Sequence, residues 1–229
     1  MTPGAVLLEN EDLLVIDKPA GRDVIPSRDP RAPACLRDEW SALRGRVWVV
    51  HRLDRDTSGV LVFAKNPAAH RRWNAAFVNR RVQKSYLAIV RGELPLVGAV
   101  VQPLREFGSG RMGVDPRGKP SDTRYAVLSA GNGARVLTVT PVTGRRHQIR
   151  AHMAFAGAPV DGDPLYGPAP RPIGGAPRLM LHAWRLSLPG EPAFPPAVEA
   201  PWPRALRDWI RVVGAEQIVY REAERGTGL

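Results

Sequence analysis

Short apolar runs separated by turn-forming residues recur along this chain and constrain its fold more than any other feature. Runs of this length and composition are typical of β-strands. They fall at residues 6–17 (two runs around an acidic turn), 47–50, 60–65, 84–92, 122–130, 134–142 and 179–188. Because few of them are separated by a helical crossover, the pattern predicts an α+β fold. We expect a large mixed, mainly antiparallel β-sheet, flanked by helices and loops.

Helical signals occupy a smaller part of the chain. The clearest is in residues 67–80, where Pro67 stands at a first helical position and Trp73 and Phe77 follow at helical spacing. Further helices are predicted at 35–43, 144–157 and 204–213, followed by a charged tail. Residues 92–120, rich in Gly and Pro, predict a hairpin or an irregular insertion. The length of 229 residues fits a single domain over residues 1–229.

The charge balance points to a polyanionic partner. The 33 basic side chains exceed the 22 acidic ones and give a net charge of +11, which favours nucleic acid over an anionic membrane surface. No apolar run approaches the roughly 20 residues of a membrane-spanning helix, and the N-terminus lacks signal-peptide features. We therefore expect a cytoplasmic protein with no membrane partner. Cys35 is the one cysteine, so no internal disulfide can form.

The most specific polar cluster is HRLDRDTSG at residues 51–59, which two apolar runs enclose. A loop held between two strands is a common place for catalytic residues, although a solvated turn is the simpler alternative. Asp54 follows Leu53, a residue that favours burial, and arginines flank this pair. A carboxylate at the edge of a core beside arginine suits a nucleophile or a base.

A second cluster, GRRHQIRAH, covers residues 144–152. If these residues are helical, Arg146 and Arg150 share one face, and Gln148 and His152 share another. Cations at a helix start oppose the helix dipole, which favours an anionic partner over the alternative of a basic surface helix. Tyr86, in the strand pattern, indicates by itself no more than a core position.

Other chemistries find less support. Ser58 has histidine and aspartate nearby, as in a hydrolase triad, but Asp56 and Thr57 precede it in place of a G-x-S-x-G turn. His147 and His152 are five residues apart, whereas a zinc-binding helix places two histidines four apart. No phosphate-binding glycine loop occurs. The sequence therefore predicts neither a metal nor a nucleotide cofactor.

Taken together, these stretches resemble the RluA-type pseudouridine synthases. The central motif of that family resembles residues 51–66, and its other motifs follow in order. They lie at Asp17–Gly21, Lys84–Ala88, Gly144–His152, Asp161–Gly167 and Leu181–Ala183. Many members carry an N-terminal S4-type RNA-binding domain. The chain has no room for one before residue 6, so we expect a member that consists of the catalytic domain alone.

The resemblance implies an isomerase, without a cofactor, that flips specific uridines out of a tRNA or rRNA stem-loop into a basic cleft. It implies that Asp54 is the nucleophile, that Tyr86 packs on the base and that Arg150 pairs with Asp54. Arg52 is expected to fill the gap left by the flipped base. Further RNA contacts are expected from His51, Thr57, Lys84, Arg145, Arg146, His147 and Gln148. Attack on the sugar, attack on the base and removal of a sugar proton stay open, and we expect a monomer. A non-catalytic RNA-binding protein or RNA-folding chaperone on the same scaffold is the alternative.

Overall fold

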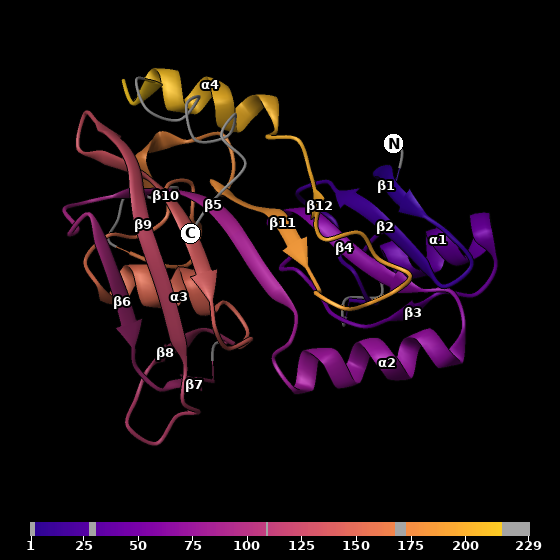
Figure 1. The fold of residues 1–229 in the computed structure, drawn as a ribbon. Helices are drawn as coiled ribbons and strands as arrows, with labels where there is room; N and C mark the ends of the chain where they lie inside the picture. Colours follow the sequence, from indigo (N-terminus) through magenta and orange to yellow (C-terminus); the bar gives the residue numbers. More distant parts are fainter. Residues whose placement is uncertain (1–2, 28–30, 109, 168–172, 217–229) are drawn as a thin grey trace. The chain divides into compact units, whose positions relative to one another are not determined.

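The computed structural model describes residues 3–27, 31–108, 110–167 and 173–216 and divides the chain into two compact units (Figure 1). The first unit comprises Met1–Lys84 and His182–Pro201, and the second comprises Ser85–Leu181 and Trp202–Leu229. The predicted charged tail lies outside the described residues, and the single domain stays a prediction. No helix within the described ranges is long and apolar enough to cross a membrane.

The strands of the first unit pair mainly antiparallel, with β1, β2, β4 and β11 side by side in this order. β11 runs parallel to β4, and β12 and β3 pair with β11 and β4 respectively. The predicted mixed, mainly antiparallel sheet is therefore confirmed. The elements are β1 (Ala5–Glu9), β2 (Leu13–Lys18), α1 (Leu36–Arg44), β3 (Trp48–Val49), β4 (Ser58–Ala64), α2 (Pro67–Val78), β11 (Leu181–Ser187) and β12 (Val198–Glu199).

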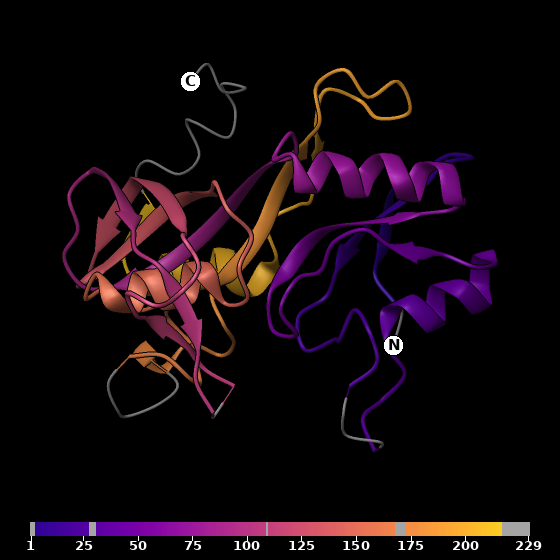
Figure 2. The same cartoon turned by 90° about the horizontal axis from the view of Figure 1, so that it is seen from below.

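Helices cover both faces of β2 and β4, as Figure 2 shows for α1 and α2 on opposite sides of the strands. Successive strand residues point to opposite faces, so Leu13 packs with Trp73 of α2 while Leu14 packs with Trp40 of α1. All four side chains are buried. This double cover explains why both strands read as nearly unbroken apolar runs, and it gives β4 a fixed position from which the preceding loop is presented.

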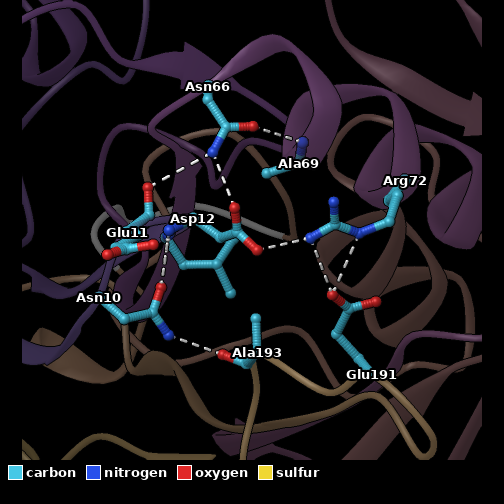
Figure 3. Close-up of polar contacts among 9 residues, drawn as sticks. Asn10, Glu11, Asp12, Asn66, Ala69, Arg72, Glu191 and Ala193 are labelled. Carbon is cyan, nitrogen blue, oxygen red and sulfur yellow. Dashed lines mark hydrogen bonds and ion pairs between the residues drawn. The ribbon is translucent and has the colours of Figure 1, made fainter.

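The start of α2 is fixed by a polar network, drawn in Figure 3. The Asn66 side chain caps the helix by accepting a hydrogen bond from the Ala69 amide (2.8 Å) and donates to Asp12 (2.7 Å). Arg72, one turn into the helix, also donates to Asp12 (2.7 Å) and pairs with Glu191 (3.3 Å). The helix predicted from Pro67 is thereby confirmed and tied to the turn between β1 and β2.

The second unit has its own antiparallel strands, in the order β5, β10, β9, β6, and a separate β7–β8 hairpin. α3 packs against β8, β9 and β10. Residues 92–120 thus contain both a regular edge strand and a hairpin. The elements are β5 (Gln83–Arg91), β6 (Val97–Val101), β7 (Leu104–Glu106), β8 (Met112–Val114), β9 (Asp122–Gly131), β10 (Ala134–Pro141), α3 (Gln148–Phe155), a short 3-10 turn (Ile173–Gly175) and α4 (Arg204–Val212).

The prediction of a helix over residues 144–157 was wrong at its start. α3 begins only at Gln148, and His147 adopts a left-handed backbone conformation (φ 49°) that cannot continue a helix. The Gln148 side chain accepts a hydrogen bond from the Arg145 amide (3.0 Å), so a side chain of α3 holds the loop that precedes the helix. Arg146 and Arg150 therefore do not share a helix face, whereas Gln148 and His152 do.

Candidate active site

The loop between β3 and β4 presents Asp54 from the first unit. Leu53, the residue before it, is buried as predicted, and Asp54 itself is half-buried. The Thr57 amide donates to the Asp54 carbonyl (3.1 Å) and closes a tight turn. β4 begins at Ser58, so the end of the polar cluster already belongs to the buried strand. Asp54 is thus separated from a fully buried strand by one turn.

A buried ammonium group holds this loop in place. Lys18, at the end of β2, is fully buried, and its Nζ donates to the carbonyls of Pro19 (2.9 Å), Arg55 (2.8 Å) and Thr57 (2.8 Å). The Arg22 amide also donates to the Arg55 carbonyl (3.1 Å). The K-P-A-G segment and the Asp54 loop are therefore joined through backbone oxygens, a role for Lys18 that its sequence pattern did not reveal.

β4 and β11 approach each other closely where the loop enters the sheet. Gly59 has φ +116°, and a Cβ atom there would lie 2.1 Å from the Ala183 carbonyl oxygen. Only glycine fits such a contact without displacing backbone. Gly59 of the central motif and Ala183 of the L-H-A motif are thus adjacent in space, although 124 residues separate Ser58 and His182 beside them.

Ser58 does form a pair with a histidine, but not one suited to hydrolysis. Its Oγ lies 2.8 Å from His182 Nδ1, and the two residues are 2% and 0% exposed. The second nitrogen of His182 lies 3.4 Å from the Ala200 carbonyl, where a triad has a carboxylate. An enclosed hydroxyl offers no approach to a substrate, so the geometry favours a structural bond between β4 and β11.

His51 takes part in the sheet itself. Its Nε2 accepts a hydrogen bond from the Val62 amide of β4 (2.9 Å), and its ring stacks on Phe77 of α2 at 4.8 Å. Burial, with a smaller contribution from the nearby positive charge of Lys84, lowers the pKa of His51 to about 3. The imidazole is therefore neutral and acts as a strand acceptor, and its expected contact with RNA stays a prediction.

Replacing His51 with glutamine is expected to flatten the dependence of stability on pH. The pKa of His51 in the folded protein, about 3, lies below the ordinary 6.5 of the unfolded chain. As pH falls below 6.5, the unfolded chain therefore binds a proton at His51 and the folded chain does not. The contribution of neutral His51 to the free energy of unfolding is fully present above pH 6.5, and about 2 kcal/mol of it is lost by pH 5. Urea unfolding of both proteins at pH 7 and pH 5 measures this, and equal losses would contradict it.

Three further candidates in the first unit differ in exposure. Thr57 is 2% exposed, and within the described residues its Oγ1 has no hydrogen-bond partner. Lys84 is half-buried, and burial lowers the pKa of its ammonium group. Arg52 is exposed. Of the three, Arg52 has the freedom to reach an RNA molecule without a rearrangement of the sheet.

In the second unit, Asp163 holds Arg150. Asp163 Oδ2 accepts from Arg150 Nε (2.7 Å) and Oδ1 accepts from Nη2 (2.9 Å), and both side chains are buried. The same carboxylate accepts from the amides of Leu165 (2.8 Å) and Tyr166 (3.1 Å). Buried arginine is stable in a protein when it has such a bidentate partner. Sequence reasoning missed Asp163 in this role, although the motif D-G-D contains it.

Gln148 belongs to a chain of buried hydrogen bonds. Its Nε2 donates to Thr123 Oγ1 (2.9 Å), which lies 2.9 Å from His152 Nδ1, and His152 Nε2 lies 3.0 Å from the Gln102 carbonyl. With the proton on Nε2, His152 donates to the Gln102 carbonyl, and its Nδ1 accepts from the Thr123 hydroxyl. That hydroxyl in turn accepts from Gln148 Nε2. Burial lowers the pKa of His152, which favours its neutral form. Gln148 therefore positions the loop before α3, and its expected contact with RNA stays a prediction.

The remaining residues of the second cluster, Arg145, Arg146 and His147, belong to the loop before α3. Arg146 is exposed and pairs with Glu106 of β7 (2.5 Å), and Arg145 is half-buried with its Nη2 3.4 Å from the Pro120 carbonyl. His147 Nδ1 lies 2.9 Å from the Tyr166 hydroxyl. Both arginines belong to the loop, so their guanidinium groups are presented by it and not by the helix.

Tyr86 lies on β5 opposite Val139 of β10 and is partly exposed. The proposed catalytic residues fall in both units, with Asp54 in the first and Tyr86 and Arg150 in the second. Each unit therefore supplies a part that the sequence predicted: a carboxylate on a fixed loop, and an aromatic ring together with a buried guanidinium. Their meeting in one basic cleft stays a prediction.

Comparison with known proteins gives the class of protein to which these parts belong. The family model described as RNA pseudouridylate synthase matches residues 12–155. An uncharacterized RNA pseudouridine synthase of Zymomonas mobilis is 37% identical over 213 residues, which are 89% of this chain and 95% of that protein. The human protein RNA pseudouridylate synthase domain containing 1 has a solved structure with a TM-score of 0.78 and 28% identity, covering 99% of this chain and 98% of that one.

Longer relatives match over part of their length. Ribosomal large subunit pseudouridine synthase D of Nitrosomonas europaea is 38% identical over 200 residues, which are 81% of this chain and 58% of that protein. The fold and the matches together define an enzyme class, the isomerases that modify RNA. Within that class, this chain belongs to the RNA pseudouridylate synthase family.

Proposed function

We propose that this chain isomerises specific uridines in ribosomal RNA or tRNA, with Asp54 as the nucleophile. The observation that carries the proposal is the Asp54 loop, held by two hydrogen bonds from Lys18 to the Arg55 and Thr57 carbonyls. The reaction breaks the N1–C1′ bond of uridine, turns the uracil and rejoins it through C5. No atoms are gained or lost, so we propose that the chain needs no redox or nucleotide cofactor.

Arg150 is the proposed partner of the Asp54 carboxylate. Its guanidinium is held on one edge by Asp163 and cannot rotate without breaking two charge-assisted hydrogen bonds. A guanidinium fixed in this way can orient a carboxylate in a set direction. Such preorganisation raises a reaction rate because the reacting groups need no rearrangement at the moment of reaction.

Flipping the target uridine out of a stem costs a few kcal/mol. Stacking of the base on the Tyr86 ring would return about 1–3 kcal/mol, and Arg52 would occupy the space left in the helix. Arg145 and Arg146 would contact phosphates, so binding should weaken as salt concentration rises. Several relatives are named ribosomal large subunit pseudouridine synthases, which favours ribosomal RNA as the substrate. We further propose that the chain acts on a stem-loop, as a monomer in the cytoplasm.

The test uses purified protein and RNA made without modifications. Transcripts of the ribosomal RNAs and a tRNA pool are incubated with the protein, and pseudouridine is mapped by chemical modification and sequencing. We expect new pseudouridine at one or a few stem-loop positions, and the same positions should be unmodified in RNA from a strain lacking the gene. Bound but unmodified RNA from every pool would instead support a binding protein or RNA chaperone.

A further inference from the structure

Tyr166 occupies the centre of a cluster in the second unit, and the proposed reaction has not yet given it a role. It is 1% exposed, and its ring contacts two guanidinium groups, with the Cζ atoms of Arg111 and Arg150 each 5.1 Å from the ring centroid. The ring of His147 meets it edge-on at 5.7 Å and 88°. Cation–π contacts with buried arginine are worth more than exposed ones because water does not screen them.

The Tyr166 hydroxyl joins two segments that lie far apart in the sequence. It accepts a hydrogen bond from the Met112 amide of β8 (2.9 Å) and lies 2.9 Å from His147 Nδ1. The amide belongs to the β7–β8 hairpin and the imidazole to the loop before α3. One hydroxyl therefore fixes the hairpin, which carries Arg111 just before β8, to the loop that presents Arg145 and Arg146.

Asp163 and the backbone of His147 show that the residues around the Tyr166 ring are held in place. Asp163 binds both the Tyr166 amide (3.1 Å) and the Arg150 guanidinium, so the ring and the cation are fixed by one carboxylate. His147 keeps a left-handed backbone (φ 49°), a conformation that costs of order 1 kcal/mol for a residue other than glycine. Strain of this kind persists where neighbouring contacts hold the residue in place.

We propose that Tyr166 is a positioning residue. Its ring holds Arg150, and its hydroxyl holds His147 and the β7–β8 hairpin in the arrangement that binds RNA. The ring acts on the chemical step through Arg150, the proposed partner of Asp54. The hydroxyl acts on binding of RNA, through the loop and the hairpin. The division between ring and hydroxyl rests on the proposed function and can be tested with two substitutions at the same position.

The experiment compares Tyr166→Phe, which keeps the ring, with Tyr166→Leu, which removes it. Tyr125→Phe is the control, because Tyr125 is a buried tyrosine of β9 in the same unit. For each protein, kcat and KM for pseudouridine formation, the Kd for RNA, the thermal midpoint and hydrogen exchange of the Met112 amide are measured below the lowest midpoint.

We expect Tyr166→Phe to raise KM and Kd about fivefold, with kcat within about twofold of wild type and faster exchange at Met112. Tyr166→Leu should in addition lower kcat by about tenfold or more, because Arg150 loses the ring that holds it. The control should match wild type in kcat, KM and Kd. Rescue of kcat by phenylalanine but not by leucine is an outcome that a purely structural role would not produce.

The proposal is overturned if both variants have a lower thermal midpoint but wild-type kcat, KM and Kd while folded. It is also overturned if phenylalanine and leucine lower kcat equally, since the ring would then have no separate role. An inactive wild-type protein would contradict the proposed function and not this inference. In that case an unchanged Kd or Met112 exchange in Tyr166→Phe would still overturn the positioning role.

Discussion

Replacing Asp54 with alanine is expected to lower kcat for pseudouridine formation by at least about 10³-fold. The change removes the proposed nucleophile but leaves the backbone that Lys18 binds, since those contacts go to the carbonyls of Pro19, Arg55 and Thr57. The loop should therefore keep its shape, and Kd for RNA should change by less than about threefold. Single-turnover assays give the rate, and filter binding gives the affinity.

The matched control is Asp56→Ala, two residues along the same loop and half-buried like Asp54. It changes the charge of the protein by the same amount, so any general electrostatic effect on RNA binding appears in both variants. We expect the control to keep at least about half of the wild-type rate. Equal rates in the two variants, or loss of both modification and RNA binding by folded Asp54→Ala, would contradict the role of Asp54 as the nucleophile.

Replacing Asp163 with asparagine should have the largest effect on stability, about 3–5 kcal/mol in the free energy of unfolding. The substitution keeps the size of the side chain but leaves the Arg150 guanidinium, 3% exposed, without its buried counter-charge. The amides of Leu165 and Tyr166 also lose a charged acceptor. Urea unfolding followed by tryptophan fluorescence measures the change, and kcat should fall as well because Arg150 is no longer held.

Asp208→Asn is the comparison for a surface pair. Asp208 of α4 binds Arg204 and Arg211, and all three side chains are largely exposed. Solvent screens such pairs, so the expected loss is at most about 0.5 kcal/mol. A similar loss in the two variants would mean that the Arg150–Asp163 pair contributes no more than a surface contact.

Much of the fold could be predicted from local patterns. The apolar runs predicted the positions of β2, β4, β5, β9 and β10. β2 and β4 are buried on both faces and have few polar residues, whereas β9 and β10 mix buried and exposed positions. The start of α2 was predicted from Pro67, which favours a first helical position, and the Asn66 cap became visible only in the structure. Features that depend on neighbours in sequence were therefore predicted well.

Features that depend on distant partners could not be predicted in this way. The parallel pairing of β4 with β11 joins residues more than a hundred positions apart, and two-residue β12 has no pattern of its own. The start of α3 was misplaced because the Gln148 side chain donates to the Asp122 carbonyl and to Thr123 Oγ1 of β9, and these contacts cannot be seen in the local sequence. His51 was expected only as an RNA contact, since nothing local indicates that its ring nitrogen accepts from a strand amide.

The buried ammonium of Lys18 also limits how the protein can adapt to its substrate. Moving the Asp54 loop would take carbonyl acceptors away from a charge that water cannot reach, at a cost of several kcal/mol. Induced fit at this loop is therefore expensive, and an RNA that fits poorly cannot be accommodated by bending it. The change of shape on binding should fall mainly on the RNA, so selection among uridines should follow how easily the RNA around each one deforms.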